Sequence, residues 1–161
     1  MARLRPLLFP GMFLALMFVS LHTLKGETKG DDAAKRDIQK VLDDQVTSWN
    51  KADLEGFMAG YWKSDDLTFY SSEKTKGWQA TFDRYRKRYQ SEGKEMGTLT
   101  FSQLEIEPLG PDTAFVRGRW RLVFAKPGGW FGRLCTMRGG LFTLIFKKKP
   151  QGWCIVHDHT S

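Results

Sequence analysis

Residues 112–126, DTAFVRGRWRLVFAK, form the clearest predicted strand of the chain. Side chains alternate along it with a period of two, which is typical of a β-strand with one buried face. One face is apolar and carries Ala114, Val116, Gly118, Trp120, Leu122 and Phe124. The other face carries Phe115, Arg117, Arg119, Arg121 and Val123. Its three arginines must meet water or a partner, so we predict an antiparallel strand between a core and a polar surface.

The period of two continues on both sides of this strand, with turns rich in glycine and proline. We predict four long strands, at 97–107, 112–126, 133–149 and 152–160. An earlier stretch, DDLTFYSS at 65–72, is rich in β-forming residues and predicts one more strand. Gly139 and Gly140 predict a bulge or a sharp bend in the third long strand.

Helical periodicity precedes the long strands. Apolar residues recur at helical spacing from Ala34 to Trp49, and Asn50 ends this first helix. Asp53 is a suitable N-cap for a short second helix that extends toward Tyr61. One face of a third helix is aromatic and carries Trp78, Phe82, Tyr85 and Tyr89. This stripe is expected in the core and can also cover a pocket.

Three helices followed by long antiparallel strands predict the α+β class. A strongly curved antiparallel sheet, wrapped on one side by N-terminal helices, would leave a cone with an interior cavity.

The first 26 residues resemble a secretory signal. Arg3 and Arg5 precede an almost wholly apolar run from Leu7 to Leu21, which is shorter than the ~20 residues that a spanning helix prefers. We expect cleavage between Ser20 and Gly26, and a secreted or periplasmic protein. The alternative is an uncleaved anchor, which would hold the protein at a membrane.

The rest of the chain is long enough for one domain. We expect a flexible lead-in at 27–33, which is polar, and a folded domain at 34–161. Residues 1–26 carry three basic residues and no acidic one, so their removal lowers the net charge from +7 to +4. This mild charge, without a recognisable nucleic-acid-binding module, predicts no nucleic-acid partner.

The cysteines and histidines give no metal or redox motif. A hairpin that turns near residues 150–152 would not place Cys135 opposite Cys154, so two buried free thiols are expected. His157 and His159 form an H-x-H pair, but a metal site needs about three protein ligands. The remaining histidine, His22, lies in the signal. We therefore expect no metal and no cofactor.

Four motifs, in order, resemble the nuclear transport factor 2-like superfamily. They are WNKADLEGFMAGYWKSDDLTFYSS at 49–72, GW…RY beginning at Gly77, A-x-V-x-G-x-W-x-L at 114–122, and FTLIF…GWCIVHDHTS at 142–161. Within this superfamily, the chain most resembles the SnoaL-like, ketosteroid-isomerase-like branch, which is the domain of unknown function numbered 4440. The resemblance implies a cone-shaped, cystatin-like α+β fold over residues 34–161, commonly a homodimer through the outer face of the sheet. It implies no single reaction, because this fold hosts many activities.

The resemblance to enzymes weakens residue by residue. Ketosteroid isomerases place a general-base aspartate where this chain has Ser71, and an oxyanion tyrosine near Gln45. A serine hydroxyl is far too weak a base to remove a carbon-bound proton unaided, so steroid-type isomerisation is disfavoured. The cavity arginines of related kinase hub domains fall on non-basic residues, namely Trp120, Leu144 and Thr160. Binding of an anion in that manner is not expected.

The comparison with hub domains also assigns the faces of the last strands. The residues that it places on the inward face are Trp120, Phe142, Leu144, Val156 and Asp158. Those on the outward face are Trp153, Ile155, His157 and His159. Asp158 would then face an apolar cavity, where a carboxyl has a raised pKa and can act as a general acid or base. The alternative is a structural role, in which Asp158 pairs with a tyrosine hydroxyl or a backbone N–H.

We predict a cavity wall made of Trp120, Phe142, Leu144, Val156, Tyr85, Trp62, Phe57 and Tyr61. Its ligand would be a small apolar or aromatic molecule. The outward residues would form either a solvated face or a homodimer interface, and they are Arg117, Arg119, Arg121, His157 and His159. Glu105 or Glu107 could pair with these arginines. Trp130 lies in a predicted loop, where it could gate the cavity or pack on a partner.

Three functions are consistent with these features. The first is an exported small-molecule-binding domain. The second is an enzyme of the isomerase or dehydratase type, with Asp158 as acid or base and Tyr85 or Tyr61 as its partner. The third is a dimeric interaction module whose cavity is filled by side chains.

Overall fold

The structure is a computed structural model that describes residues 29–92, 94–126 and 134–161. The predicted signal and Trp130 lie outside this part of the chain. Within the described ranges, no helix is long and apolar enough to cross a membrane.

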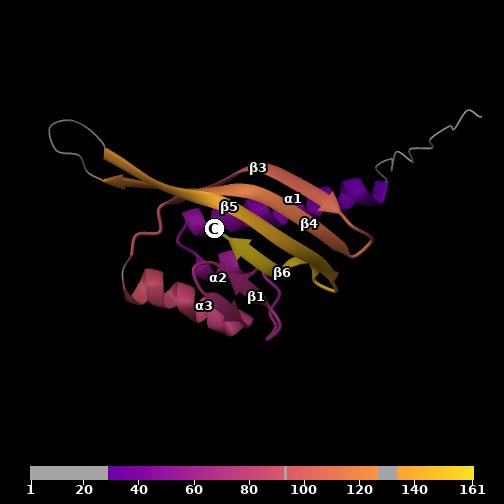
Figure 1. Cartoon of the computed structure of the whole chain (residues 1–161), viewed down its shortest axis with the longest axis horizontal. Helices are drawn as coiled ribbons and strands as arrows, with labels where there is room; N and C mark the ends of the chain where they lie inside the picture. The colour runs from indigo at the N-terminus through magenta and orange to yellow at the C-terminus, as the bar shows by residue number, and fades with distance from the viewer. Residues whose placement is uncertain (1–28, 93, 127–133) are drawn as a thin grey trace, which may run out of the picture.

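Helices and strands follow one another in the predicted order (Figure 1). The helical elements are α1 (Lys29–Asn50), α2 (Leu54–Met58), α3 (Trp78–Arg86) and the π-helical turn η1 (Lys87–Ser91). The strands are β1 (Thr68–Tyr70), β2 (Lys74–Lys76), β3 (Thr98–Pro108), β4 (Thr113–Lys126), β5 (Leu134–Lys149) and β6 (Gly152–Thr160). The α+β class is confirmed. Only β2 was not predicted, because its sequence, KTK, is wholly polar.

The six strands form one curved sheet in the order β2-β1-β6-β5-β4-β3. Neighbouring strands are antiparallel except β1 and β6, which are parallel, so the sheet is mixed rather than wholly antiparallel as predicted. The parallel pairing places Phe69 beside Asp158, and Thr68 and Tyr70 beside the two histidines of β6.

The first helix is longer than predicted. It begins at Lys29, so most of the predicted flexible lead-in is helical. Its end is fixed to β3, because the Asn50 side-chain amide both donates to the Leu99 carbonyl (3.1 Å) and accepts from the Leu99 amide (2.7 Å). Asp53 caps α2 as predicted, since its carboxylate accepts from the Gly56 amide at 2.8 Å.

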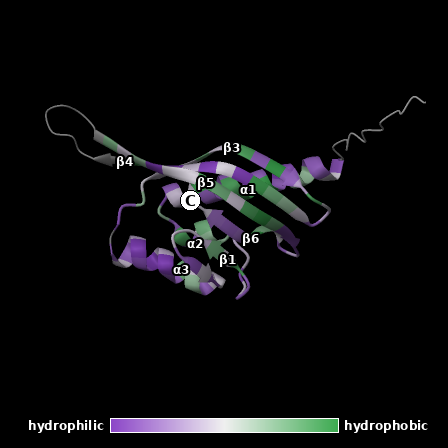
Figure 2. Cartoon of the chain, viewed as in Figure 1, coloured by the Kyte–Doolittle hydropathy of each residue, from purple (hydrophilic) through white to green (hydrophobic). Residues whose placement is uncertain are grey.

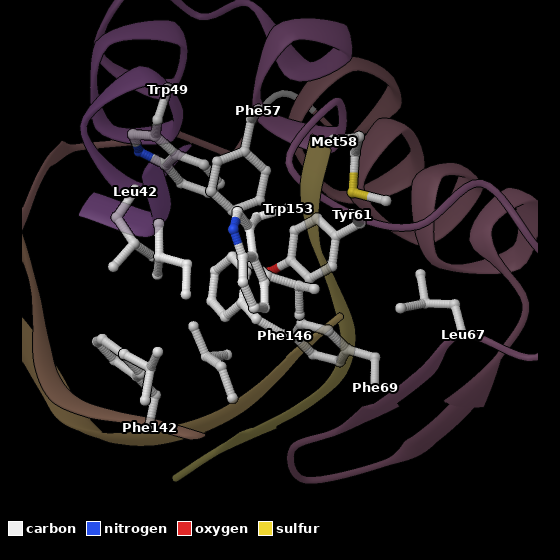
Figure 3. Packing of buried hydrophobic residues seen from close by; sticks show 14 of the residues in the cluster. Leu42, Trp49, Phe57, Met58, Tyr61, Leu67, Phe69, Phe142, Phe146 and Trp153 are labelled. Atoms are coloured by element: carbon white, nitrogen blue, oxygen red, sulfur yellow. The ribbon is translucent and has the colours of Figure 1, made fainter. Parts of the chain in front are cut away.

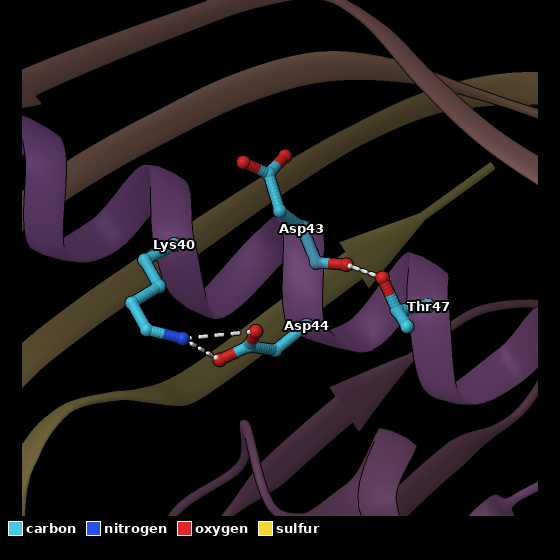
Figure 4. A network of polar contacts seen from close by, with 4 residues as sticks. All are labelled: Lys40, Asp43, Asp44 and Thr47. Atoms are coloured by element: carbon cyan, nitrogen blue, oxygen red, sulfur yellow. Dashed lines mark hydrogen bonds and ion pairs between the residues drawn. The ribbon is translucent and has the colours of Figure 1, made fainter.

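The outer side of α1 is solvated. Lys40 pairs with Asp44 at 2.7 Å, and the Thr47 hydroxyl donates to the Asp43 carbonyl (Figure 4). Exposed pairs of this kind contribute about 0.3–0.5 kcal/mol to stability, so they mainly keep this face soluble. Figure 2 shows α3 coloured mainly as hydrophilic.

The core lies between the helices and the concave side of the sheet. Trp49 and Phe57 from the helices face Phe142 and Phe146 from the sheet, and the Tyr61 ring packs beside them (Figure 3). The inward face of β4 is confirmed, since Ala114 and Val116 are fully buried.

A β-bulge at Val156 changes the predicted faces of β6. Ile145 pairs with His157, whereas the next residue, Phe146, pairs with Ile155, which leaves Val156 as the extra residue. Trp153 and Ile155 are therefore buried, where period two predicted an outward position.

The glycine pair in β5 forms no bulge. The pairing of β4 with β5 is uninterrupted through Gly139 and Gly140. A Cβ on Gly140 would overlap the carbonyl oxygen of Ser161, so glycine is required there for the close approach of the last residue. Both cysteines are free as predicted, but Cys135 is exposed rather than buried.

Candidate functional site

A cavity of about 500 Å³ lies between the concave side of the sheet and the helices. Its buried wall is largely aromatic and aliphatic, and one buried carboxyl, Asp158, lies in it. This volume falls within the usual range for small-molecule sites, about 300–1,000 Å³.

The structure brings together most of the predicted wall. The residues in it are Phe57, Tyr61, Tyr85, Trp120, Phe142, Leu144 and Asp158. Two predicted members are elsewhere. Val156 is displaced by the bulge, and Trp62 packs under the Lys149 ammonium, 4.1 Å from the ring centre. Trp62 follows Tyr61, which bridges to Ile155, and successive side chains of extended backbone point to opposite sides.

Asp158 is held by two hydroxyl groups. The Tyr61 hydroxyl donates to Oδ2 at 2.7 Å, and the Thr160 hydroxyl donates to Oδ1 at 2.6 Å. The residue is only 4% exposed. These bonds fix the carboxyl plane, and each oxygen keeps acceptor capacity for a ligand.

Burial raises the pKa of Asp158 to about 6, although the hydrogen bonds from Thr160 and Tyr61 favour the ionised form. Both protonation states are therefore populated near neutral pH, as general acid–base chemistry requires. Burial, and next the charge of Asp158, raises the pKa of Tyr61 well above its usual value. Tyr61 thus remains a hydrogen-bond donor.

The positions that correspond to ketosteroid isomerase residues lie in the wall. Gln45 is buried and donates to the Phe57 carbonyl at 3.1 Å. Ser71 accepts from Arg84 at 2.9 Å. Neither side chain is a carboxylate or a phenol, so neither reproduces the acid–base group of the ketosteroid isomerases, and Asp158 is the buried carboxyl of the cavity.

The cavity wall also contains a group of basic residues that the sequence pattern did not predict there, namely Arg84, Arg88, Lys94 and Arg138. A run of basic residues on a helix usually indicates a solvated face, so the sequence pattern did not place these residues at a cavity. A signal was present, however. Arg84 and Arg88 are four residues apart, so they lie on one side of the helical segment, next to the predicted wall residue Tyr85.

The two histidines of β6 lie on the other side of the sheet from the cavity. The Thr68 hydroxyl is 2.6 Å from Nδ1 of His157, and the Tyr70 ring lies near both imidazoles. Burial lowers the pKa of His157. In the described part of the chain, no group of three or more histidine, cysteine or acidic residues is arranged to hold a metal ion.

On the same outer face, Arg117 pairs with Glu105 at 2.9 Å and Glu107 at 3.4 Å in its own chain. These acids therefore already have a partner within the monomer. Arg119 donates weakly to Gln103 at 3.4 Å. The face also carries the exposed apolar side chains of Met137 and Leu141.

A family model described as the SnoaL-like domain matches residues 38–161 of this chain. The chain belongs to the SnoaL-like family. No curated protein matches the SnoaL-like chain.

Solved structures confirm the nuclear transport factor 2-like fold. One is a protein of this fold and of unknown function from Shewanella oneidensis, with 34% identity and a TM-score of 0.68 over 79% of this chain and 98% of the other. A superfamily member from Salmonella enterica has 20% identity and a TM-score of 0.64 over 81% and 91% of the two chains. A candidate scytalone dehydratase from Novosphingobium aromaticivorans has 16% identity and a TM-score of 0.66 over 84% and 89%. The last two show the fold alone.

The raised pKa of Asp158 predicts a pH-dependent stability. Between the usual value of 3.8 and about 6, the native state holds a proton that the unfolded chain releases. Stability is therefore highest below this window and is lost as the pH rises through it. Compared with Asp158→Asn, the wild type should lose about 2–3 kcal/mol of unfolding free energy from pH 4 to pH 7.

Urea unfolding of both proteins across this range measures the difference. The Asn variant controls for all other titrating groups. A difference that stays constant with pH would show that the Asp158 pKa is not raised.

Proposed function

We propose that this SnoaL-like domain binds a small, mainly apolar or aromatic molecule in the cavity beside Asp158. The observation that supports this most is a cavity of about 500 Å³ between sheet and helices, with a buried carboxyl in an otherwise aromatic wall. An interaction module with a filled interior would not need this space. The hydroxyls of Tyr61 and Thr160 orient the carboxyl, so it can anchor one polar group of the ligand.

A cavity-filling variant tests the binding proposal. Leu144 lies in the wall, and Leu144→Trp places a large ring in the cavity. We expect the wild type to bind the neutral fluorophore N-phenyl-1-naphthylamine, and the variant to bind it at least about tenfold more weakly, which corresponds to about 1.4 kcal/mol. Fluorescence titration gives both dissociation constants.

The matched control is Leu141→Trp on the same strand, because Leu141 is exposed on the outer face. It should bind the dye like the wild type. Near-UV circular dichroism verifies that both variants are folded, since overpacking costs about 1–3 kcal/mol. Equal binding by Leu144→Trp, or no binding by the wild type, would contradict the proposal.

The second candidate function is acid–base catalysis of the isomerase or dehydratase type. It is favoured by the pKa of about 6 at Asp158, which suits a carboxyl that takes and returns a proton at neutral pH. In this reaction the carboxylate removes a proton from the carbon next to a carbonyl, and a tyrosine hydroxyl donates to the oxygen. Tyr85 fits this role better than Tyr61, because the one O–H of Tyr61 already donates to Asp158.

Deuterium exchange separates catalysis from binding. If Asp158 is the base, the protein accelerates α-hydrogen exchange of 2-tetralone in heavy water, measured by proton NMR. Asp158→Asn should lower this acceleration by about 10²–10⁴-fold, the usual contribution of a general base, without weakening the binding of N-phenyl-1-naphthylamine. No acceleration by the wild type would leave the domain a binding protein.

We also propose that the protein is exported and forms a homodimer. The basic and then apolar composition of residues 1–26 supports export. The exposed apolar residues of the outer sheet face, Met137 and Leu141, support a partner there.

Native mass spectrometry of the protein purified from its own host measures both properties. We expect twice the mass of a chain that starts between residues 20 and 27, as the predicted cleavage requires. A full-length mass would indicate a retained anchor, and a monomer mass would contradict the dimer.

A further inference from the structure

Three arginines of the cavity wall lie against aromatic rings rather than carboxylates. The guanidinium of Arg84 is 5.8 Å from the ring centre of Phe69. Arg88 is 5.6 Å from Tyr89, and Arg138 is 5.6 Å from Phe124. All these residues line the cavity. In the described part of the chain, none of the three arginines has a carboxylate within ion-pair distance.

Arg84 differs from the other two because it is half-buried, whereas Arg88 and Arg138 are exposed. Its Nη2 donates to the Ser71 hydroxyl at 2.9 Å and its Nη1 to the Thr75 hydroxyl at 3.2 Å. Both acceptors are neutral, so they orient the guanidinium without balancing its charge. A partly buried cation is costly unless it is paired, and a guanidinium has five N–H donors in a fork that fits an anion.

The Tyr85 hydroxyl lies in the fields of the same groups. Burial raises the pKa of Tyr85, Asp158 raises it further, and Arg84 and Arg88 lower it. The Tyr85 hydroxyl is therefore close enough to the carboxyl of Asp158 and to both arginines for their charges to change its pKa. Within the described residues it has no hydrogen-bond partner, so it is a second donor available to a ligand.

The exposed rim of the cavity is positive. Arg88, Lys94 and Arg138 line the cavity together with one exposed acidic residue, Glu95. Lys94 also pairs with Glu92 at 2.9 Å. A rim of one predominant sign raises the local concentration of ligands of the opposite charge.

We propose that the ligand of this cavity is an apolar molecule that carries one anionic group, and that Arg84 is the main counterion of that group. The inference rests on the proposed function, because the apolar part needs the cavity. The apolar part lies against the aromatic wall near Asp158, and the anion accepts from Arg84 and Tyr85. A carboxylate, as in an aromatic or acyl acid, is the simplest group that fits a guanidinium fork.

This anion site differs from the one suggested by the kinase hub domains. Their arginine positions correspond here to Trp120, Leu144 and Thr160 on the sheet, and all three line the cavity without a charge. In this chain the positive charge of the cavity wall comes from Arg84 on α3, Arg88 on η1, Lys94 after η1, and Arg138 on β5.

Two fluorophores that share one apolar body test the proposal. N-phenyl-1-naphthylamine is neutral, and 8-anilinonaphthalene-1-sulfonate adds one sulfonate to the same rings. We expect the wild type to bind the sulfonate more tightly. Arg84→Gln should weaken sulfonate binding by about tenfold or more, as expected for the loss of a charged hydrogen bond, and change binding of the neutral dye by less than about twofold.

The matched control is Arg121→Gln, which removes the same charge from the exposed outer face of β4. It should leave both dyes unaffected. Equal weakening of both dyes by Arg84→Gln would assign Arg84 a purely structural role and overturn the proposal. So would equal effects of the two arginine variants on the sulfonate, which would reflect only the net charge. If the wild type binds neither dye, the proposed function itself fails along with this inference.

Discussion

The single extra residue in the last strand, Val156, is the constraint on which the site depends. In a regular strand, Ile155 and Asp158 point to opposite faces, because their positions differ by an odd number. The bulge removes this conflict, so Ile155 closes the core while Asp158 points into the cavity. It also keeps His157 on the outer face. Bulges often re-aim a side chain next to a functional site, and this one directs the only buried carboxyl among the described residues.

The direction of Asp158 then accounts for the chemistry of the cavity. A carboxyl in an aromatic wall is costly to ionise, and the hydroxyls of Tyr61 and Thr160 offset part of this cost. Arg84, on the same wall, donates to the neutral hydroxyls of Ser71 and Thr75, which orient its guanidinium without balancing the charge. The cavity thus combines an apolar body, a carboxyl of intermediate pKa, and a positive rim. This combination suits a ligand with both an apolar body and polar groups, whether or not a proton is transferred.

The sequence predicted the class, the superfamily and the long strands, because period two extends over many residues from position 97 onward. Most residues predicted for the wall do line the cavity. Those on β4 and β5 keep period two, and the resemblance to hub domains indicated which of their faces is inward. The error in the faces of β6 arises from one extra residue. The bulge reversed the faces predicted for Trp153, Ile155 and Val156. No glycine lies at the bulge to indicate it. Arg84 was missed for a different reason, because an arginine beside a hydrophobic stripe looks the same whether it faces water or a cavity.

The proposed site exists only if the space beside Asp158 is open and apolar rather than filled by side chains. A crystal structure determined under xenon pressure tests this, because xenon binds in apolar cavities. We expect a xenon atom against Leu144 and Phe142, with the carboxyl of Asp158 directed into the same cavity. An interior without xenon, in which the side chains of Trp49, Phe57 and Phe142 close over Asp158, would contradict it.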